Sequence, residues 1–214
     1  MPADAGDTLL IQFARCPEVG AVKTRMIPNL SPQQACDLHC DLVRWTARRL
    51  VACRLGPVRL AVTGDVSHPL FADCRDLGVN QVVEQEGGDL GERMYRALGA
   101  GLAHYRKVIL VGSDCPELDR ACLQQAVAAL ERVPVVLGPA ADGGYVLIGA
   151  REISREIFRE IDWGSSSVYA RTVSRLEDAA ISWEALPVKR DVDRPGDLAY
   201  WSRVKARGGL GGPA

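Results

Sequence analysis

Apolar residues follow two patterns along the chain, and each pattern predicts one kind of secondary structure. Short and almost wholly aliphatic runs, such as 8–14 and 108–111, are typical of strands buried on both faces of a parallel sheet. Between the runs, apolar residues recur three and four positions apart, as on the buried face of an amphipathic helix. One helix is predicted to begin at Asp89, with Glu92 in a capping-box position. Its expected buried face consists of Leu90, Met94, Ala97 and Leu98.

Strands and helices alternate throughout the sequence, which predicts an α/β fold of three layers, α/β/α, around a mainly parallel mixed sheet. No linker or repeat divides the chain, so we expect one domain over residues 1–207 and a mobile tail over 208–214. Strands are predicted at 8–14, 58–62, 81–84, 107–111, 133–137, 145–148 and 181–188. Helices are predicted from 31, near 70–77, from 89, from 119, from 165–167 to about 177, and from 195 to 201.

Charge and composition exclude several classes of protein. The 214 residues carry a formal net charge of −1, so the chain lacks the basic field of a nucleic-acid-binding protein. No apolar run is long enough for a membrane span and the N-terminus does not resemble a signal peptide, so a cytoplasmic protein is expected. Cys36, His39 and Cys40 share one helix, but a zinc site would need further ligands. We interpret the cysteines as reduced thiols.

A carboxylate follows the 107–111 strand directly. Gly112 permits a sharp turn there, and Pro116 keeps the preceding residue out of a helix. Open α/β sheets bind ligands at the carboxyl ends of their strands, so Asp114 is a candidate site residue. The alternative is that Asp114 only caps a turn.

The loop after the first predicted strand carries two cations, Lys23 and Arg25. It is not a phosphate-binding loop of the Walker A type, because Val22 stands where that motif needs glycine. Its position and charge nevertheless suit the binding of a diphosphate or triphosphate. A solvated basic loop is the alternative.

Two further carboxylates, Asp191 and Asp193, lie near the C-terminus. Mg²⁺ in proteins commonly takes one or two carboxylates together with phosphate oxygens of the substrate. Asp114 with Asp193 or Asp191 fits this number, although Asp193 could instead cap the helix after Pro195. The turn at 142–144 contains two glycines, which allow a close approach to a ligand but also suit an ordinary hairpin.

Six motifs occur in a fixed order between about residues 9 and 201: Phe13-Ala14-Arg15-x-Pro17-x-x-Gly20-x-Val22-Lys23-Thr24-Arg25, Gly88 to Met94, Gly112 to Pro116, Gly138-Pro139-x-x-Asp142-Gly143-Gly144-Tyr145, Trp163 to Ser166, and Asp191-Val192-Asp193-x-Pro195-x-Asp197-Leu198. Together they resemble a family of small bacterial glycosyltransferase-like proteins of the GT-A type. That family is related to phospholactate guanylyltransferase and to the molybdenum-cofactor nucleotidyltransferases.

The resemblance implies a nucleotide-diphospho-sugar transferase fold and a set of site residues. It implies that Lys23, Arg25 and Asp114 are catalytic and that Asp114, Asp193 and Asp191 hold Mg²⁺ or Mn²⁺. The implied nucleotide-binding residues are Phe13, Ala14, Lys23, Arg25, Leu90, Gly91, Arg93 and Ser113. The implied acceptor side consists of Asp142, Gly143, Gly144 and Tyr145.

The favoured function is glycosyl transfer from a nucleotide sugar to a small-molecule acceptor, assigned by resemblance alone. One alternative is nucleotidyl transfer from a nucleoside triphosphate to a phosphate-bearing acceptor. Another is a nucleotide-binding module without catalysis. A homodimer with Trp183 and Trp201 in the subunit contact is also left open.

Overall fold

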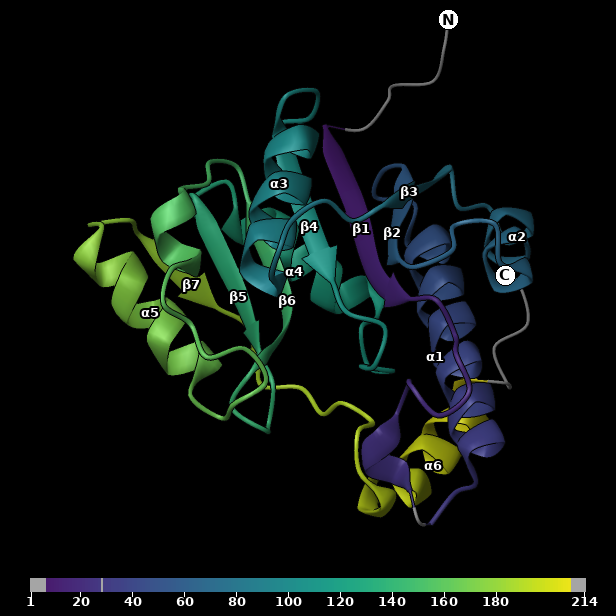
Figure 1. The fold of residues 1–214 in the computed structure, drawn as a ribbon. Coiled ribbons are helices and arrows are strands. Elements are labelled where there is room, and N and C mark those ends of the chain that lie inside the picture. The colour runs from purple at the N-terminus through teal and green to yellow at the C-terminus, as the bar shows by residue number, and fades with distance from the viewer. Residues whose placement is uncertain (1–6, 28, 209–214) are drawn as a thin grey trace, which may run out of the picture.

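A mixed seven-stranded sheet lies at the centre of the structure, with helices on both faces (Figure 1). The structure, a computed structural model, describes residues 7–27 and 29–208. It confirms the predicted α/β class and the mainly parallel mixed sheet. In chain order the elements are β1 (Thr8–Arg15), η1 (Thr24–Met26), α1 (Pro32–Cys53), β2 (Val58–Thr63), α2 (Pro69–Asp76), β3 (Gln81–Glu84), α3 (Leu90–Leu102), β4 (Lys107–Val111), α4 (Arg120–Ala129), β5 (Val135–Pro139), β6 (Tyr145–Ala150), η2 (Arg155–Phe158), α5 (Val168–Asp178), β7 (Trp183–Ala185), η3 (Pro195–Asp197) and α6 (Leu198–Gly208).

The strand order is β3-β2-β1-β4-β6-β5-β7. β6 runs antiparallel to both of its neighbours, whereas the other paired strands are parallel. The loops that follow β1 and β4 therefore leave the sheet side by side, at the carboxyl ends of these two strands. Such sheets bind ligands at the carboxyl ends of their strands.

Each face of the sheet has its own buried core. Helices α1, α2 and α4 cover one face, where side chains such as Leu10 and Ile109 are fully buried. Helix α3, η2 and α5 cover the other face, over side chains such as Ile11 and Val108. Leu10 and Ile11 point to opposite faces because successive side chains alternate along a strand. Since helices cover both faces, every residue of β1 except Arg15 is buried.

A third, smaller core joins the C-terminal helix α6 to α1 and η1. Trp201 is buried there, with its ring centroid 5.1 Å from that of Trp45 in an edge-to-face arrangement. Trp183 packs against Tyr169 in the same way. The expectation that Trp201 lies in a subunit contact is therefore wrong, because its indole is enclosed within the chain.

Several predicted boundaries also differ from the structure. The last strand spans only Trp183–Ala185, and the last helix continues past Trp201 to Gly208. Gly208 therefore ends a helix, and the rest of the predicted tail lies outside the described residues. Leu90 is 42% exposed, so it does not belong to the buried face of α3. In the described part of the chain, no helix has both the length and the apolar character that crossing a membrane requires.

Candidate functional site

The ends of β1 and β4 are joined by buried side chains. Gln12 donates a hydrogen bond from Nε2 to Ser113 Oγ at 2.9 Å, and Ser113 Oγ donates to the carbonyl of Phe13 at 2.8 Å. Gln85 Nε2 donates to the carbonyl of Ala14 at 3.1 Å. These bonds fix the first turn after each strand, so the loops that carry the charged residues start from rigid positions.

Lys23 has a buried ammonium group, and only 4% of its side chain is exposed. Its Nζ lies 2.9 Å from Asp114 Oδ2 and 3.7 Å from Asp193 Oδ1, and it donates to the carbonyl of Val192 at 2.6 Å. The backbone of Lys23 is left-handed (φ 50°, ψ 36°), a conformation that a side chain disfavours. The three oxygen atoms that contact Nζ stabilise this backbone conformation, which directs the lysine side chain into the protein.

The chain near residue 192 brings the C-terminal carboxylates to the end of β4. The amide of Val192 donates to the carbonyl of Asp114 at 2.8 Å, and the Val192 side chain is fully buried. Asp193 then accepts a bond from Arg25 Nη1 at 2.6 Å. Asp193 does not cap the following helix. The carboxylate of Asp197 instead accepts hydrogen bonds from the backbone amides of Asp193 and Arg194.

Asp197 keeps the pKa of its carboxyl below the ordinary value. Burial alone would raise this pKa, but bonds from the Arg194 amide, the Arg190 guanidinium and the Asp193 amide favour the charged form. The ionised Asp197 thus orders the loop that presents Asp191 and Asp193.

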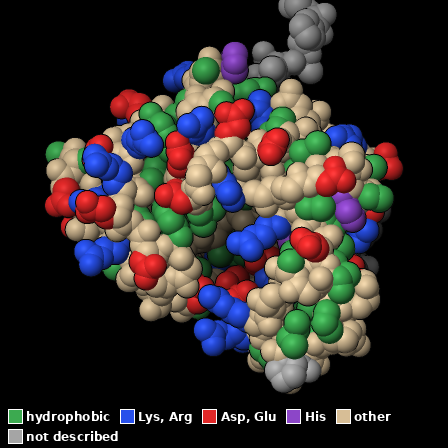
Figure 2. Space-filling view, viewed as in Figure 1, with side chains coloured by type: hydrophobic (Ala, Val, Ile, Leu, Met, Phe, Trp, Pro, Cys, Tyr) green, Lys and Arg blue, Asp and Glu red, His purple; other side chains and the backbone are tan. Residues whose placement is uncertain are grey.

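A cleft of about 490 Å³ opens beside Lys23, over the ends of β1 and β4. Figure 2 shows this face of the molecule hollowed near its centre, with basic and acidic side chains around the hollow. Seven of the eight residues expected to bind a nucleotide line this cleft: Phe13, Ala14, Lys23, Arg25, Leu90, Arg93 and Ser113. Gly91 does not. A Cβ at that position would lie 2.6 Å from the Trp163 ring, so Gly91 permits the close packing of α3 instead.

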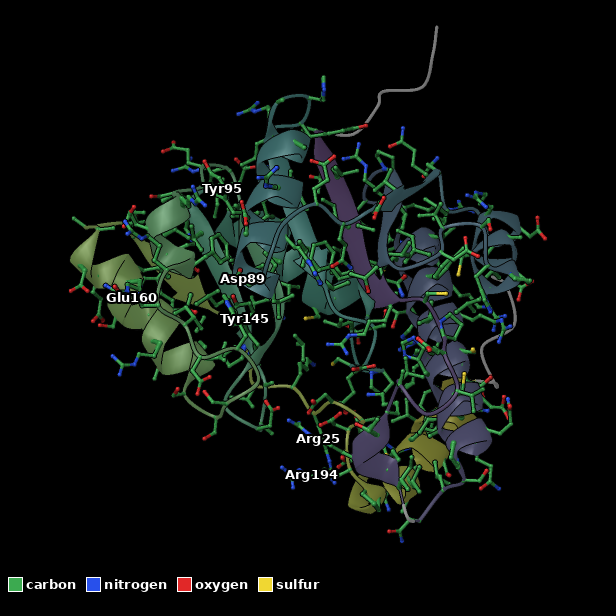
Figure 3. The ribbon with its side chains drawn as sticks, viewed as in Figure 1. Arg25, Asp89, Tyr95, Tyr145, Glu160 and Arg194 are labelled. Atoms are coloured by element: carbon green, nitrogen blue, oxygen red, sulfur yellow. The ribbon has the colours of Figure 1, made fainter. Side chains whose placement is uncertain are left out.

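A second cleft of about 330 Å³ adjoins the first and shares Arg25, Asp114 and Asp193 with it. Three of the four expected acceptor residues, Asp142, Gly144 and Tyr145, line it. Gly143 lies behind the turn, where φ is +94° and a Cβ would lie 2.1 Å from the carbonyl oxygen of Ser166. In Figure 3, Tyr145 lies across the opening from Arg25 and Arg194.

Asp191 lies with Asp142 in this second cleft and does not line the first. Its pKa is raised to about 6 by burial and by the negative charges of Asp142 and Asp193. Of the three carboxylates expected to bind a metal, Asp114 and Asp193 both contact Lys23, whereas Asp191 lines the second cleft with Asp142.

Several residues that line the first cleft were not assigned to the site from the sequence, among them Arg15, His39 and Gln85. His39 lies on α1, where its Nε2 is 3.0 Å from the carbonyl of Arg15, and burial lowers its pKa. Because His39 lies within a predicted helix, the sequence did not indicate that it reaches the loops of the site. Arg15 belongs to the first of the six motifs, and its position at the end of a predicted strand could have indicated that it lines the cleft.

The carboxylates of Asp114 and Asp193 fit a divalent cation that is also held by a substrate. Asp114 Oδ1 is buried and has no hydrogen-bond partner among the described residues, although 42% of the side chain is exposed. Such an oxygen is costly unless a ligand satisfies it. No group of three or more His, Cys, Asp or Glu within residues 7–27 and 29–208 is arranged to hold a metal, so phosphate oxygens would have to complete the shell.

Comparison with known proteins gives a family and a fold. A family model described as "Uncharacterized protein conserved in bacteria (DUF2064)" matches residues 46–165. No curated protein matches the chain. Among solved structures, a Desulfovibrio desulfuricans protein described as a proposed nucleotide-diphospho-sugar transferase is 29% identical, with a TM-score of 0.81 over 92% of this chain and 88% of that one.

Two more distant structures share the fold. A nucleotidyl transferase from Methanothermobacter thermautotroptrophicus is 13% identical, with a TM-score of 0.62 over 94% of this chain and 98% of that one. Glucosyl-3-phosphoglycerate synthase from Mycobacterium tuberculosis, in complex with Mg²⁺ and uridine-diphosphate, is 15% identical, with a TM-score of 0.54 over 98% and 82%. The structural neighbours are thus transferases of both the nucleotide-sugar and the nucleotidyl kind.

Proposed function

This chain belongs to the DUF2064 family of bacterial proteins, and we propose that it is a metal-dependent transferase with a nucleotide-activated donor. The observation that carries the proposal is the meeting of Lys23, Asp114 and Asp193 where the two clefts join. A donor in one cleft and an acceptor in the other would react at this junction. Glycosyl transfer from a nucleotide sugar is the favoured reaction.

In glycosyl transfer, a hydroxyl oxygen of the acceptor forms a bond to the anomeric carbon of the donor sugar. The bond from that carbon to the phosphate oxygen breaks, the nucleoside diphosphate leaves with the electron pair, and the hydroxyl proton passes to a carboxylate of the acceptor cleft. Negative charge grows on the leaving phosphate. Lys23 and Arg25 would stabilise it, because preorganised cations in a partly buried site act more strongly than cations in water.

A divalent cation would add charge stabilisation on the phosphate oxygens. Asp114 and Asp193 would hold it, together with the donor phosphates. Lys23 keeps these two carboxylates together before any ligand binds, because its ammonium group contacts both. The protein would therefore present a preformed site, which lowers the cost of ordering on binding.

Nucleotidyl transfer is the second candidate, and the charge of the first cleft favours it. Arg15, Lys23, Arg25 and Arg93 all line that cleft and outnumber its two carboxylates, Asp114 and Asp193, so a triphosphate would meet a net positive charge there. In this reaction an acceptor oxygen bonds the α-phosphorus, and pyrophosphate leaves.

One assay separates these functions. Purified protein with Mg²⁺ or Mn²⁺ is given nucleoside triphosphates or nucleotide sugars, each with mixed hydroxyl- and phosphate-bearing acceptors. Release of a nucleoside diphosphate from a nucleotide sugar supports glycosyl transfer, and release of pyrophosphate supports nucleotidyl transfer. Tight binding without either product would support the non-catalytic module, and absence of binding would refute all three.

Asp114→Ala should abolish metal-dependent nucleotide binding, because it removes a carboxylate that faces both clefts. Isothermal titration with the donor in Mn²⁺ measures this effect. Asp73→Ala is the control, because Asp73 pairs with Arg44 outside both clefts. Equal affinity in the Asp114→Ala variant and in the unaltered protein would show that the metal assignment is wrong.

A further inference from the structure

The two adjoining clefts carry opposite charge, and this contrast indicates what the second one can accept. The first cleft is lined by four cations (Arg15, Lys23, Arg25 and Arg93) and two carboxylates (Asp114 and Asp193). The second is lined by one cation, Arg25, and by four carboxylates: Asp114, Asp142, Asp191 and Asp193. Apart from the shared Arg25, Asp114 and Asp193, the charged side chains that line the first cleft are all cations, and those that line the second are all carboxylates.

The single cation of the second cleft is already engaged. Arg25 Nη1 lies 2.6 Å from Asp193 Oδ2, and the Asp142 and Asp191 carboxylates contribute to the charged surroundings of its guanidinium. An anionic group placed in this cleft would therefore meet uncompensated carboxylates at Asp142 and Asp191. The repulsion would be stronger at Asp191, which is partly buried, than at Asp142, which is exposed to water.

A third hollow beyond Asp142 and Asp191 offers no better place for an anion. Its charged residues that do not line the second cleft are Arg190, Arg194 and Asp197. Arg190 Nη2 lies 2.6 Å from Asp197 Oδ1, so Asp197 neutralises it. Arg25, Arg190 and Arg194 thus face four carboxylates across this hollow.

The opposite wall of the second cleft is apolar and aromatic. Tyr145 and Trp163 form an edge-to-face pair with centroids 6.5 Å apart, and Met94 and Val168 extend the surface. The Tyr145 hydroxyl points to Met94 Sδ at 3.9 Å, so it is directed into the protein. An aromatic wall facing carboxylates suits a ring with apolar C–H groups on one side and hydroxyl or ammonium donors on the other.

We propose that the acceptor is a polyhydroxylated compound that carries an amino group and no phosphate. This inference rests on the proposed transferase function and specifies its acceptor. It also bears on the choice of reaction, because a cleft that repels phosphate disfavours transfer to a phosphate-bearing acceptor. Asp142 and Asp191 would bind the ammonium group and thereby orient a hydroxyl toward the junction at Asp114.

The test compares three probes of nearly equal shape: glucosamine, glucose and glucose 6-phosphate. Each is titrated into the full chain in the presence of saturating uridine diphosphate and of Mg²⁺ without Mn²⁺. The indole N–H signal of Trp163 is followed by NMR. Trp163→Phe identifies that signal among the four tryptophans. We expect glucosamine to bind on the order of tenfold more tightly than glucose, the scale of one hydrogen bond to a charged group, and glucose 6-phosphate to bind more weakly than both.

Asp142→Asn and Asp191→Asn should each reduce the preference for glucosamine over glucose severalfold. Arg93→Gln is the matched control, because Arg93 lines only the first cleft, so it should weaken uridine diphosphate and leave the order of the probes unchanged. Preferred binding of glucose 6-phosphate, equal binding of the three, or binding of none would overturn the inference. Because nucleotide binding is titrated first and separately, these results are distinct from a failure of the proposed function, in which the nucleotide itself does not bind.

Discussion

Lys23 and a divalent cation are expected to neutralise the same two carboxylates, and replacing the lysine tests this directly. Lys23→Met keeps most of the side-chain volume and removes the charge that lies 2.9 Å from Asp114 and 3.7 Å from Asp193. Breaking a fully buried ion pair costs about 3–5 kcal/mol, whereas an exposed one contributes about 0–1 kcal/mol. Asp114 is 42% exposed and Asp193 is 25% exposed, so we expect an intermediate loss of about 2 kcal/mol.

That loss corresponds to a fall in Tm of about 4–8 °C for a chain of this size. Differential scanning calorimetry measures it in metal-free buffer and again with Mn²⁺. Because a cation bound to the native state stabilises it, Mn²⁺ should restore most of the lost stability of Lys23→Met and should stabilise the unaltered protein less. In the unaltered protein, the ammonium group already supplies the positive charge.

Lys107→Met is the matched control. Lys107 is also a buried ammonium, with 5% of its side chain exposed, and it pairs with Asp7 and Glu131 at the start of β4, away from the clefts. This variant should lose stability too, but Mn²⁺ should not restore it. Equal restoration of both variants, or of neither, would refute the assignment of Asp114 and Asp193 to a cation.

Two further predictions concern the loops that frame the site. Asp197→Asn should lower the free energy of unfolding by about 1–2 kcal/mol near pH 7. Because the folded-state pKa of Asp197 lies below the ordinary 3.8, this loss should persist above about pH 4 and disappear as the pH falls through the folded-state pKa. A loss in denaturant unfolding that is constant from pH 7 to pH 2 would contradict the prediction. Gly143→Ala should destabilise the chain by roughly 3 kcal/mol, through left-handed strain at φ +94° and a clash with the Ser166 carbonyl. Gly164→Ala has a similar φ of +92° and open space, so it should show the strain alone, and equal losses in chemical denaturation would remove the clash from the explanation.

The sequence predicted the layers and the charged ends of the strands because these depend on local pattern. The aliphatic runs of β1 and β4 are buried on both faces, as their composition indicates. The position of β6 between β4 and β5 depends on which strand pairs with which, and no local pattern contains that information. Leu90 was assigned to a buried face from its spacing, but it lies at the first turn of α3, where the helix projects over the cleft.

The candidate site could be proposed from the sequence as a set of residues but not as an arrangement. Asp114 and Lys23 were identified from loop position and charge, and the structure places their charged groups in contact. The sequence did not distinguish Asp193, which contacts Lys23, from Asp191, which faces Asp142. That difference depends on the amide of Val192, whose bond to the carbonyl of Asp114 sets the register of a segment with no regular secondary structure.

The bond between Val192 and Asp114 also determines when the charged centre can form during synthesis. A ribosome-bound chain that ends before Val192 can already contain β1, β4 and their loops, yet Lys23 then lacks the Val192 carbonyl and Asp193. The sheet can pair as its strands emerge, whereas the ammonium group of Lys23 must wait for the segment around residue 192 before it has all of its partners. An unfinished or clipped chain could thus keep the strands of the sheet and still lack the arrangement of Lys23, Asp114 and Asp193 on which the proposed activity depends.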